Sequence, residues 1–175
     1  MKNMQAALFI YLFIIGLFVG SFLNLVSDRL PNGKKFVFGR SKCDFCHETL
    51  KPKNLIPIFS FVFQKGRCSF CHKKLPLFYP LSEFMTGVSF VLAGHLSEFV
   101  YNPNVQSTIL LSYYIVVFGF FITIFLTDVK YYLIPDSIVI PAIVFVFLSS
   151  VLFRVFDLVD LKRNLAADEL GVYLL

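Results

Sequence analysis

Residues 6–26 read AALFIYLFIIGLFVGSFLNLV, a stretch of 21 residues without a charged side chain. A helix needs about 20 mostly apolar residues to cross the ~30 Å hydrocarbon core of a membrane. The stretch is longer than the ~7–15 apolar residues of a signal peptide, and no A-x-A cleavage site follows it. It therefore predicts an uncleaved first transmembrane helix.

Three further stretches have the length of a membrane span and few or no charges: 77–96, 107–127 and 137–153. Only the first of them contains an acidic or a histidine side chain, Glu83 and His95. The whole chain is 57% hydrophobic and 15% charged, against about 25% charged residues in soluble domains. This composition excludes a disordered chain and argues against an ordinary soluble domain. We expect an all-α, polytopic integral membrane protein with about four spans.

The polar segment 27–78 separates the first two spans and is strongly basic. It holds 11 of the 16 lysines and arginines and three of the 11 acidic residues, a net charge of +8 against +5 for the whole chain. Basic loops stay in the cytoplasm, which places the turn near Lys130 on the same side. Such a charge can bind nucleic acid, but retention and contact with anionic membrane lipids explain it more simply. We expect no nucleic-acid partner.

These patterns predict four regions along the chain. They are a first transmembrane helix (1–26), a cytoplasmic basic domain (27–78), three further helices with a cytoplasmic turn at 128–137 (79–153), and an outer tail or the start of a fifth span (154–175).

All four cysteines lie in the basic segment, at Cys43, Cys46, Cys68 and Cys71, with the spacing C-x2-C-x21-C-x2-C. The surrounding sequences repeat, CDFCHETL at 43–50 and CSFCHKKL at 68–75. Two residues between thiolates let one tight turn present both sulfurs to a tetrahedral ion, so this spacing predicts a structural four-thiolate zinc site. Two disulfides are the alternative, but disulfides rarely persist in a reducing compartment. A redox C-x-x-C site is a weaker alternative, because it needs one cysteine pair and the sequence has two.

Histidines follow both pairs, and we interpret His47 and His72 as surface or supporting groups and not as ligands. A closed shell of four thiolates has no open position for a substrate. The zinc site therefore folds the polar segment 27–78, which forms an insert between the first two spans, and does not carry out catalysis.

Three acidic residues lie at or near membrane depth. Asp128 directly follows the 107–127 stretch, at the C-terminal end of the expected helix. An acid there opposes the helix dipole, so Asp128 is a functional candidate. Asp136 is interpreted as the N-cap of the last span. Glu83 lies inside the second span, where acids are functional by default, although the dipole at a helix N-terminus also favours one.

Taken together, these motifs resemble those of the prepilin peptidases, membrane aspartic peptidases that process type IV pilins and pseudopilins. The matching pieces are GSFLNLVSDRLP at 20–31, SKC at 41–43, NLIPIFS at 54–60, GRC at 66–68, YPLSE at 79–83, and Asp128 through IPD at 134–136. The double C-x-x-C followed by Y-P-x-x-E is the most specific part.

The resemblance implies a peptidase of the bacterial inner membrane that cuts the basic leader of prepilin or pseudopilin precursors at the cytoplasmic face. Many members also N-methylate the new terminus with S-adenosylmethionine. Asp128 would be the first catalytic aspartate, and the four cysteines would hold zinc.

One part of the family pattern is missing from the sequence. The second catalytic aspartate of the family lies in a G-x-G-D motif beyond a further span, and the 175 residues contain no such motif. Three interpretations remain open: a truncated product, a chain complemented by a separate chain that supplies the second aspartate, or an inactive remnant. We expect little or no peptidase activity from this chain alone.

A non-enzymatic function is the competing hypothesis. The chain would then be a membrane-anchored zinc knuckle that acts in assembly or docking. A transporter is disfavoured, because it would need more intramembrane charges than Glu83.

Overall fold

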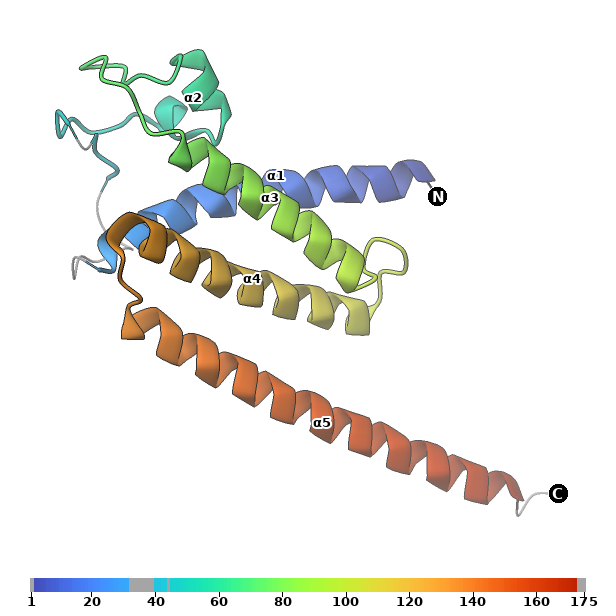
Figure 1. Ribbon diagram of the computed structural model, residues 1–175. Coiled ribbons are helices and arrows are strands. Elements are labelled where there is room, and N and C mark those ends of the chain that lie inside the picture. The colour runs from blue at the N-terminus through green and yellow to red at the C-terminus, as the bar shows by residue number, and fades with distance from the viewer. Residues whose placement is uncertain (1, 32–39, 44, 173–175) are drawn as a thin grey trace. The chain divides into compact units, whose positions relative to one another are not determined.

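The computed structural model describes residues 2–31, 40–43 and 45–172, with side chains described as far as Phe156. The elements are α1 (Lys2–Arg29), the 3-10 turn η1 (Pro52–Leu55), α2 (Phe59–Phe63), α3 (Phe78–Leu96), α4 (Val105–Tyr131) and α5 (Asp136–Val172) (Figure 1). In this part of the chain, extended pairing is limited to two isolated bridges. The all-α prediction is therefore confirmed. The chain divides into two units, Met1–Val139 and Ile140–Leu175.

Among the described residues, three helices are long and apolar enough to cross a membrane: α1, α4 and the Asp136–Phe156 part of α5. The predicted stretch 77–96 does form a helix, α3, but it is not among the three. Its buried polar residues, including Ser82, Glu83 and Thr86, reduce its apolar character and lie among its packed positions. The chain is a polytopic membrane protein, and the crossing by α3 stays a prediction.

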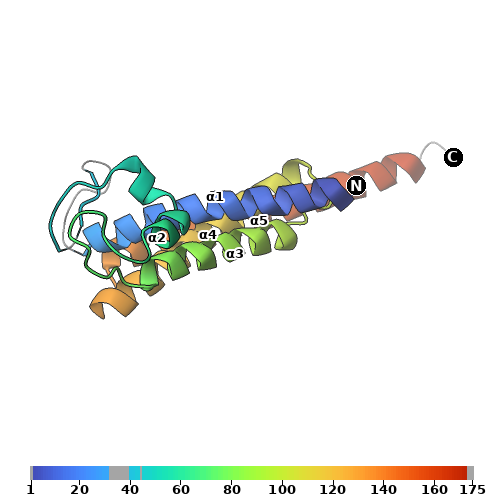
Figure 2. The ribbon, with the colours of Figure 1, turned by 90° about the horizontal axis from the view of Figure 1, so that it is seen from above.

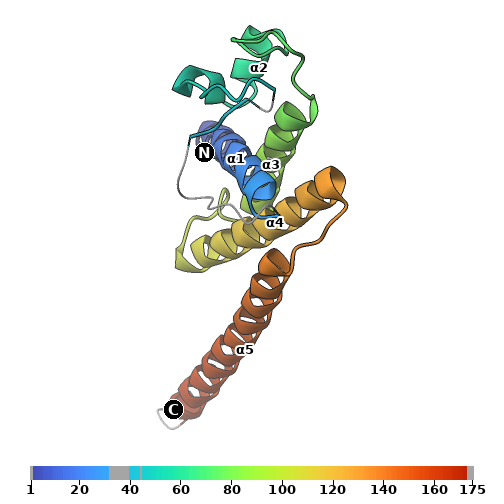
Figure 3. The same ribbon diagram turned by 90° about the vertical axis from the view of Figure 1, so that its left-hand side faces the viewer.

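Small residues bring α1 and α3 into close contact. A Cβ atom added to Gly16 would lie 2.7 Å from the Cα of Gly87, and one added to Gly20 would lie 2.8 Å from the Cα of Glu83. Glycines four residues apart form one face of a helix, and this face lets two backbones approach within a membrane. The two helices pack along this face with α4 beside them (Figure 3).

The hydrophobic core of the Met1–Val139 unit lies at the end of α1, α3 and α4 that is far from the insert. It is built from Leu12 of α1, Phe90 and Ala93 of α3, Val100 of the following loop and Leu111 of α4. This core fixes the relative positions of α1, α3 and α4, and so of the polar groups at the opposite end.

Helix α4 continues beyond its predicted end. Asp128 lies within its last turn, and the helix ends because Tyr132 adopts a left-handed conformation and donates its N–H to the carbonyl of Asp128 at 2.8 Å. The connection to α5 is residues 132–135, shorter than the expected turn at 128–137. Helix α5 continues past Arg154, through most of the expected tail. The side chains of 157–175 lie outside the described residues.

Candidate metal centre and the adjoining cavity

The first C-x-x-C pair lies on a tight turn held by backbone hydrogen bonds. The N–H of Cys43 donates to the carbonyl of Glu48 at 3.0 Å, and the N–H of His47 donates to the carbonyl of Cys43 at 2.9 Å. His47 has a φ of 56°, a left-handed conformation that reverses the chain directly after the second cysteine. The turn therefore directs two thiols to one side.

The second pair repeats this geometry. The N–H of Cys68 donates to the carbonyl of Lys73 at 3.0 Å, the N–H of His72 donates to the carbonyl of Cys68 at 3.0 Å, and the φ of His72 is again 56°. The repeat seen in the sequence is thus a repeat of structure. It also explains the two histidines, which occupy the reversing position of each turn.

The two turns bring all four thiols together. The Sγ atoms of Cys43, Cys46, Cys68 and Cys71 lie within 4.8 Å of one another, and those of Cys43 and Cys71 are 3.9 Å apart. A tetrahedral zinc ion with Zn–S bonds of about 2.3 Å requires sulfurs about 3.8 Å apart. All four cysteines are free thiols. The cluster therefore has the size and donors of a four-thiolate metal site and does not contain disulfides.

The thiols of this cluster are not equivalent as acids. Backbone N–H groups of Cys71 and Phe70 donate to the sulfur of Cys68 and lower the pKa of its thiol to about 7. The backbone N–H of Glu48 also lowers the pKa of the Cys46 thiol, but desolvation and contacts with the other three sulfurs outweigh it and raise that pKa to about 11. The four thiols compete for few backbone N–H hydrogen-bond donors. A bound divalent cation removes this competition, because it coordinates all four sulfurs as thiolates.

Glu83 attaches the four-thiol insert to the helices. Its side chain is buried, and its Oε2 accepts a hydrogen bond from the backbone N–H of Ile58 at 2.7 Å. The hydroxyl of Ser21 on α1 also hydrogen bonds to it. Ile58 has a φ of 58°, which is rare for a β-branched residue. Glu83 thus joins α1, α3 and the insert at one point.

A second polar contact joins α4 to α1 at the same end of the unit. The Nζ of Lys130 lies 2.8 Å from the Oδ1 of Asp28 and 3.3 Å from the Oγ of Ser27. Lys130 also lies 4.8 Å from the ring centroid of Tyr79 on α3. From the sequence, only the side of the membrane on which the turn near Lys130 lies was predicted, because the pairing with Asp28 joins residues 102 positions apart.

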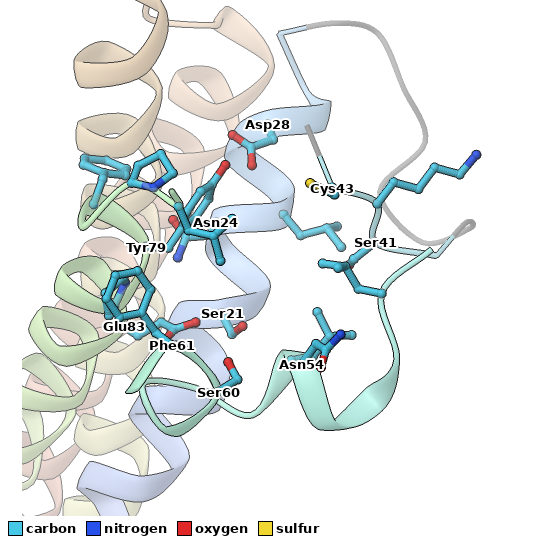
Figure 4. A pocket seen from close by; sticks show the side chains of 18 of the residues that line it. Ser21, Asn24, Asp28, Ser41, Cys43, Asn54, Ser60, Phe61, Tyr79 and Glu83 are labelled. Atoms are coloured by element: carbon cyan, nitrogen blue, oxygen red, sulfur yellow. The ribbon is translucent and has the colours of Figure 1, made fainter. Parts of the chain in front are cut away.

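A cavity of about 1090 Å³ lies between the insert and the helices (Figure 4). Asn24 and Asp28 of α1 and Tyr79 and Glu83 of α3 line one side of it, and residues of the insert line the other. The insert contributes Asn54, whose Nδ2 is buried and has no hydrogen-bond partner among the described residues. An unsatisfied buried donor of this kind costs about 1–3 kcal/mol.

Asp128 lies outside this cavity. Its side chain is exposed on the last turn of α4, and the cavity is lined instead by the three residues that follow it, 129–131. Asp136 is exposed in the first turn of α5. In the part of the chain that the structure describes, no hydrogen bond joins the two carboxylates, and their predicted roles stay predictions.

Comparisons with known proteins agree with this architecture. Residues 14–96, which comprise most of α1, the insert and α3, match the family described as the bacterial peptidase A24 N-terminal domain. The prepilin leader peptidase/N-methyltransferase of Bacillus subtilis is 36% identical over 74% of this chain and 49% of its own length. The protein of the same name from Klebsiella pneumoniae is 35% identical over 75% of this chain and 57% of its own length. The one from Myxococcus xanthus is 30% identical over 75% of this chain and 37% of its own length. No solved structure matches the chain.

The fold and the site define a polytopic helical membrane protein with a four-thiol insert of the peptidase A24 N-terminal type. Over about three quarters of its length the chain is similar to prepilin leader peptidase/N-methyltransferases, the family that its sequence motifs resemble. It spans about half the length of the curated relatives that it matches.

Proposed function

We propose that this chain takes part in prepilin leader cleavage and that Asp128 is one of two catalytic carboxylates. The observation that carries the proposal is the four-thiol insert attached to membrane helices, in a chain that resembles prepilin leader peptidases over three quarters of its length. Asp128 lies two residues before Lys130, which pairs with Asp28 beside the cavity. The proposed carboxylate is thus at the same end of the helices as the insert.

The proposed chemistry requires two carboxylates that share one proton. The ionised carboxylate takes a proton from water, and the protonated one polarises the scissile carbonyl. Like charges at contact distance keep the two ionisations apart. Asp128 supplies one of these groups, and its exposure on α4 leaves it accessible to a partner carboxylate and to a substrate helix. A cytoplasmic site follows from the basic insert.

Asp128→Asn should lower the rate of cleavage of a precursor that carries a basic leader about a thousandfold or more. Asparagine cannot accept or donate the proton that the two carboxylates share. The assay uses membranes of the cells that produce the chain, so that every natural component is present. The matched control is Asp136→Asn, an exposed acid eight residues further along, which should leave cleavage unchanged. Full cleavage by the Asp128→Asn protein would contradict the catalytic role.

Asp128→Asn, compared with a cysteine variant, distinguishes the non-enzymatic alternative, in which the insert docks an assembly partner. A docking function predicts that Asp128→Asn has no effect while loss of a metal-binding cysteine abolishes function. The four-thiol site fits this alternative equally well, because a closed thiolate shell is structural in either case.

We also propose that the cavity binds the methyl donor of an N-methylation step, S-adenosylmethionine. The names of the relatives include N-methyltransferase, and the donor would supply an activated methyl group. Residues of the cavity fit such a ligand: Arg40 suits its carboxylate, Tyr79 suits its aromatic base, and the unpaired Nδ2 of Asn54 suits an acceptor nitrogen or oxygen.

Asn54→Leu should weaken binding of the product analogue S-adenosylhomocysteine about five- to thirtyfold, since loss of one hydrogen bond to a buried partner costs about 1–2 kcal/mol. Calorimetry on the purified protein in detergent measures this directly. Ser69→Ala, a change on the second cysteine turn outside the cavity lining, is the control. Equal affinities of the Asn54→Leu and unchanged proteins would exclude Asn54 as a ligand-binding residue.

A further inference from the structure

The segment 55–63 of the insert, LIPIFSFVF, exposes an unusual number of large apolar side chains. It links the two cysteine turns, contains no charge and ends with α2. Phe63 is 82% exposed, and the other exposed members are Leu55, Ile56, Phe59 and Val62. Exposed apolar side chains gathered in one short segment favour an interaction site with a membrane or a protein.

The depth of this segment is set by its contact with the helices. Ile58 bonds to Glu83, which also bonds to Ser21 of α1. Ser21 precedes the end of α1 at Arg29 by eight residues, or about 12 Å along the helix axis. Both Figure 1 and Figure 2 show α2 beside α1 and not beyond its end. The segment therefore lies at a level where α1 is still uncharged.

The helices at the same level expose apolar side chains as well. Phe18 and Phe22 of α1 and Leu81 and Phe84 of α3 are each about half exposed. In a chain whose helices cross a membrane, such side chains face lipid. The surface of the 55–63 segment thus lies at the level of surfaces that the bilayer already covers.

Basic residues flank the segment on both sides. They are Lys51 and Lys53 before it and Lys65 and Arg67 after it, and all four are exposed. Long basic side chains can place their charges among lipid headgroups while apolar neighbours insert more deeply. Each such residue near an anionic surface contributes about 1 kcal/mol of attraction. The charge pattern complements an anionic membrane surface.

We propose that the 55–63 segment inserts into the boundary between lipid headgroups and acyl chains, in the leaflet nearest the metal-binding insert. Interfacial segments of this type lie about 5–10 Å deep, and the hydrogen bond to Glu83 holds Ile58 beside the uncharged part of α1. The two cysteine turns are then anchored to the membrane through the segment that joins them. This inference rests on the membrane-spanning fold and is independent of peptidase activity.

The chain contains no tryptophan, so a single substitution gives a unique fluorescent probe. Phe63→Trp places it in the segment, and Phe70→Trp places it on the second cysteine turn, where Phe70 is also exposed. Each protein is reconstituted at high dilution into phosphatidylcholine–phosphatidylglycerol vesicles containing acyl chains brominated near the headgroup. We expect the Phe63→Trp emission to be blue-shifted and quenched several-fold more strongly than that of Phe70→Trp.

Two results would overturn the proposal. One is equal, weak bromine quenching of the two probes in protein that retains its metal. The other is a Phe63→Trp probe protected from aqueous acrylamide but not quenched by bromine, since a protein surface such as a second copy would then cover it. Val62→Trp repeats the measurement if the first variant does not fold. Changing Lys51, Lys53 and Lys65 to glutamine should reduce quenching of the segment probe.

Discussion

Replacing Cys68 with serine is expected to empty the metal centre and unfold the insert. Cys68 is buried and belongs to a cluster whose four sulfurs lie within 4.8 Å of one another. Structural zinc contributes about 10–16 kcal/mol of binding free energy to small domains that lack a large core. Metal analysis should show about one zinc ion per chain in the unchanged protein and almost none in the variant, and trypsin should cleave the variant rapidly at the basic residues of the insert.

The control for this prediction is His72→Asn. Asparagine tolerates the left-handed conformation that His72 adopts directly after Cys71. Since the four sulfurs complete the shell without this imidazole, the variant should retain its zinc and its protease resistance. Zinc loss equal to that of Cys68→Ser would instead make the histidine a ligand. A Cys68→Ser protein that kept full zinc would contradict the four-thiolate site.

Replacing Gly20 with leucine is expected to separate α1 from α3. A Cβ atom at this position would lie 2.8 Å from both the Cα of Glu83 and the Oγ1 of Thr86. Overpacking usually costs about 1–3 kcal/mol, and we expect at least about 3 kcal/mol here because helix backbone must move. The midpoint of thermal unfolding in detergent, followed by size-exclusion chromatography, should fall by several degrees.

Gly119 of α4 provides the matched control, because a Cβ atom there would meet nothing within 4 Å. Gly119→Leu adds the same side chain to a membrane helix at an open position and should leave the midpoint nearly unchanged. If the two leucine variants unfolded at the same temperature, the close packing of α1 on α3 would be wrong. Loss of this packing should also disturb Glu83, and with it the attachment of the insert.

The four-thiol cluster could be predicted from the sequence because its determinants are local. Each C-x-x-C pair is contained in one turn, and the repeat of the turn at an offset of 25 residues made their convergence on one ion a reasonable expectation. The three most apolar helices could be predicted equally well, since span length and absence of charge are properties of continuous stretches.

The contacts that position the site could not be predicted in this way. Asn24 and Ser82 are 58 residues apart, and Lys130 and Asp28 are 102 residues apart. Nothing in the sequence near either partner specifies the other. From the sequence, Asp28 was therefore interpreted only through loop charge and the motif at 20–31, and Glu83 only as an acid at membrane depth and part of the motif at 79–83. For Lys130, only the side of the membrane on which its turn lies was predicted. The packing of Gly16 and Gly20 had a local signal, the four-residue spacing, but the partner helix did not follow from it.

The most direct test of the account is X-ray absorption at the zinc edge on the full chain, purified without added reductant. We predict one bound zinc ion with four sulfur neighbours at about 2.3 Å, together with four cysteines that become reactive when the metal is removed. A protein that contained no zinc and whose four sulfurs were oxidised as two disulfides would contradict the account.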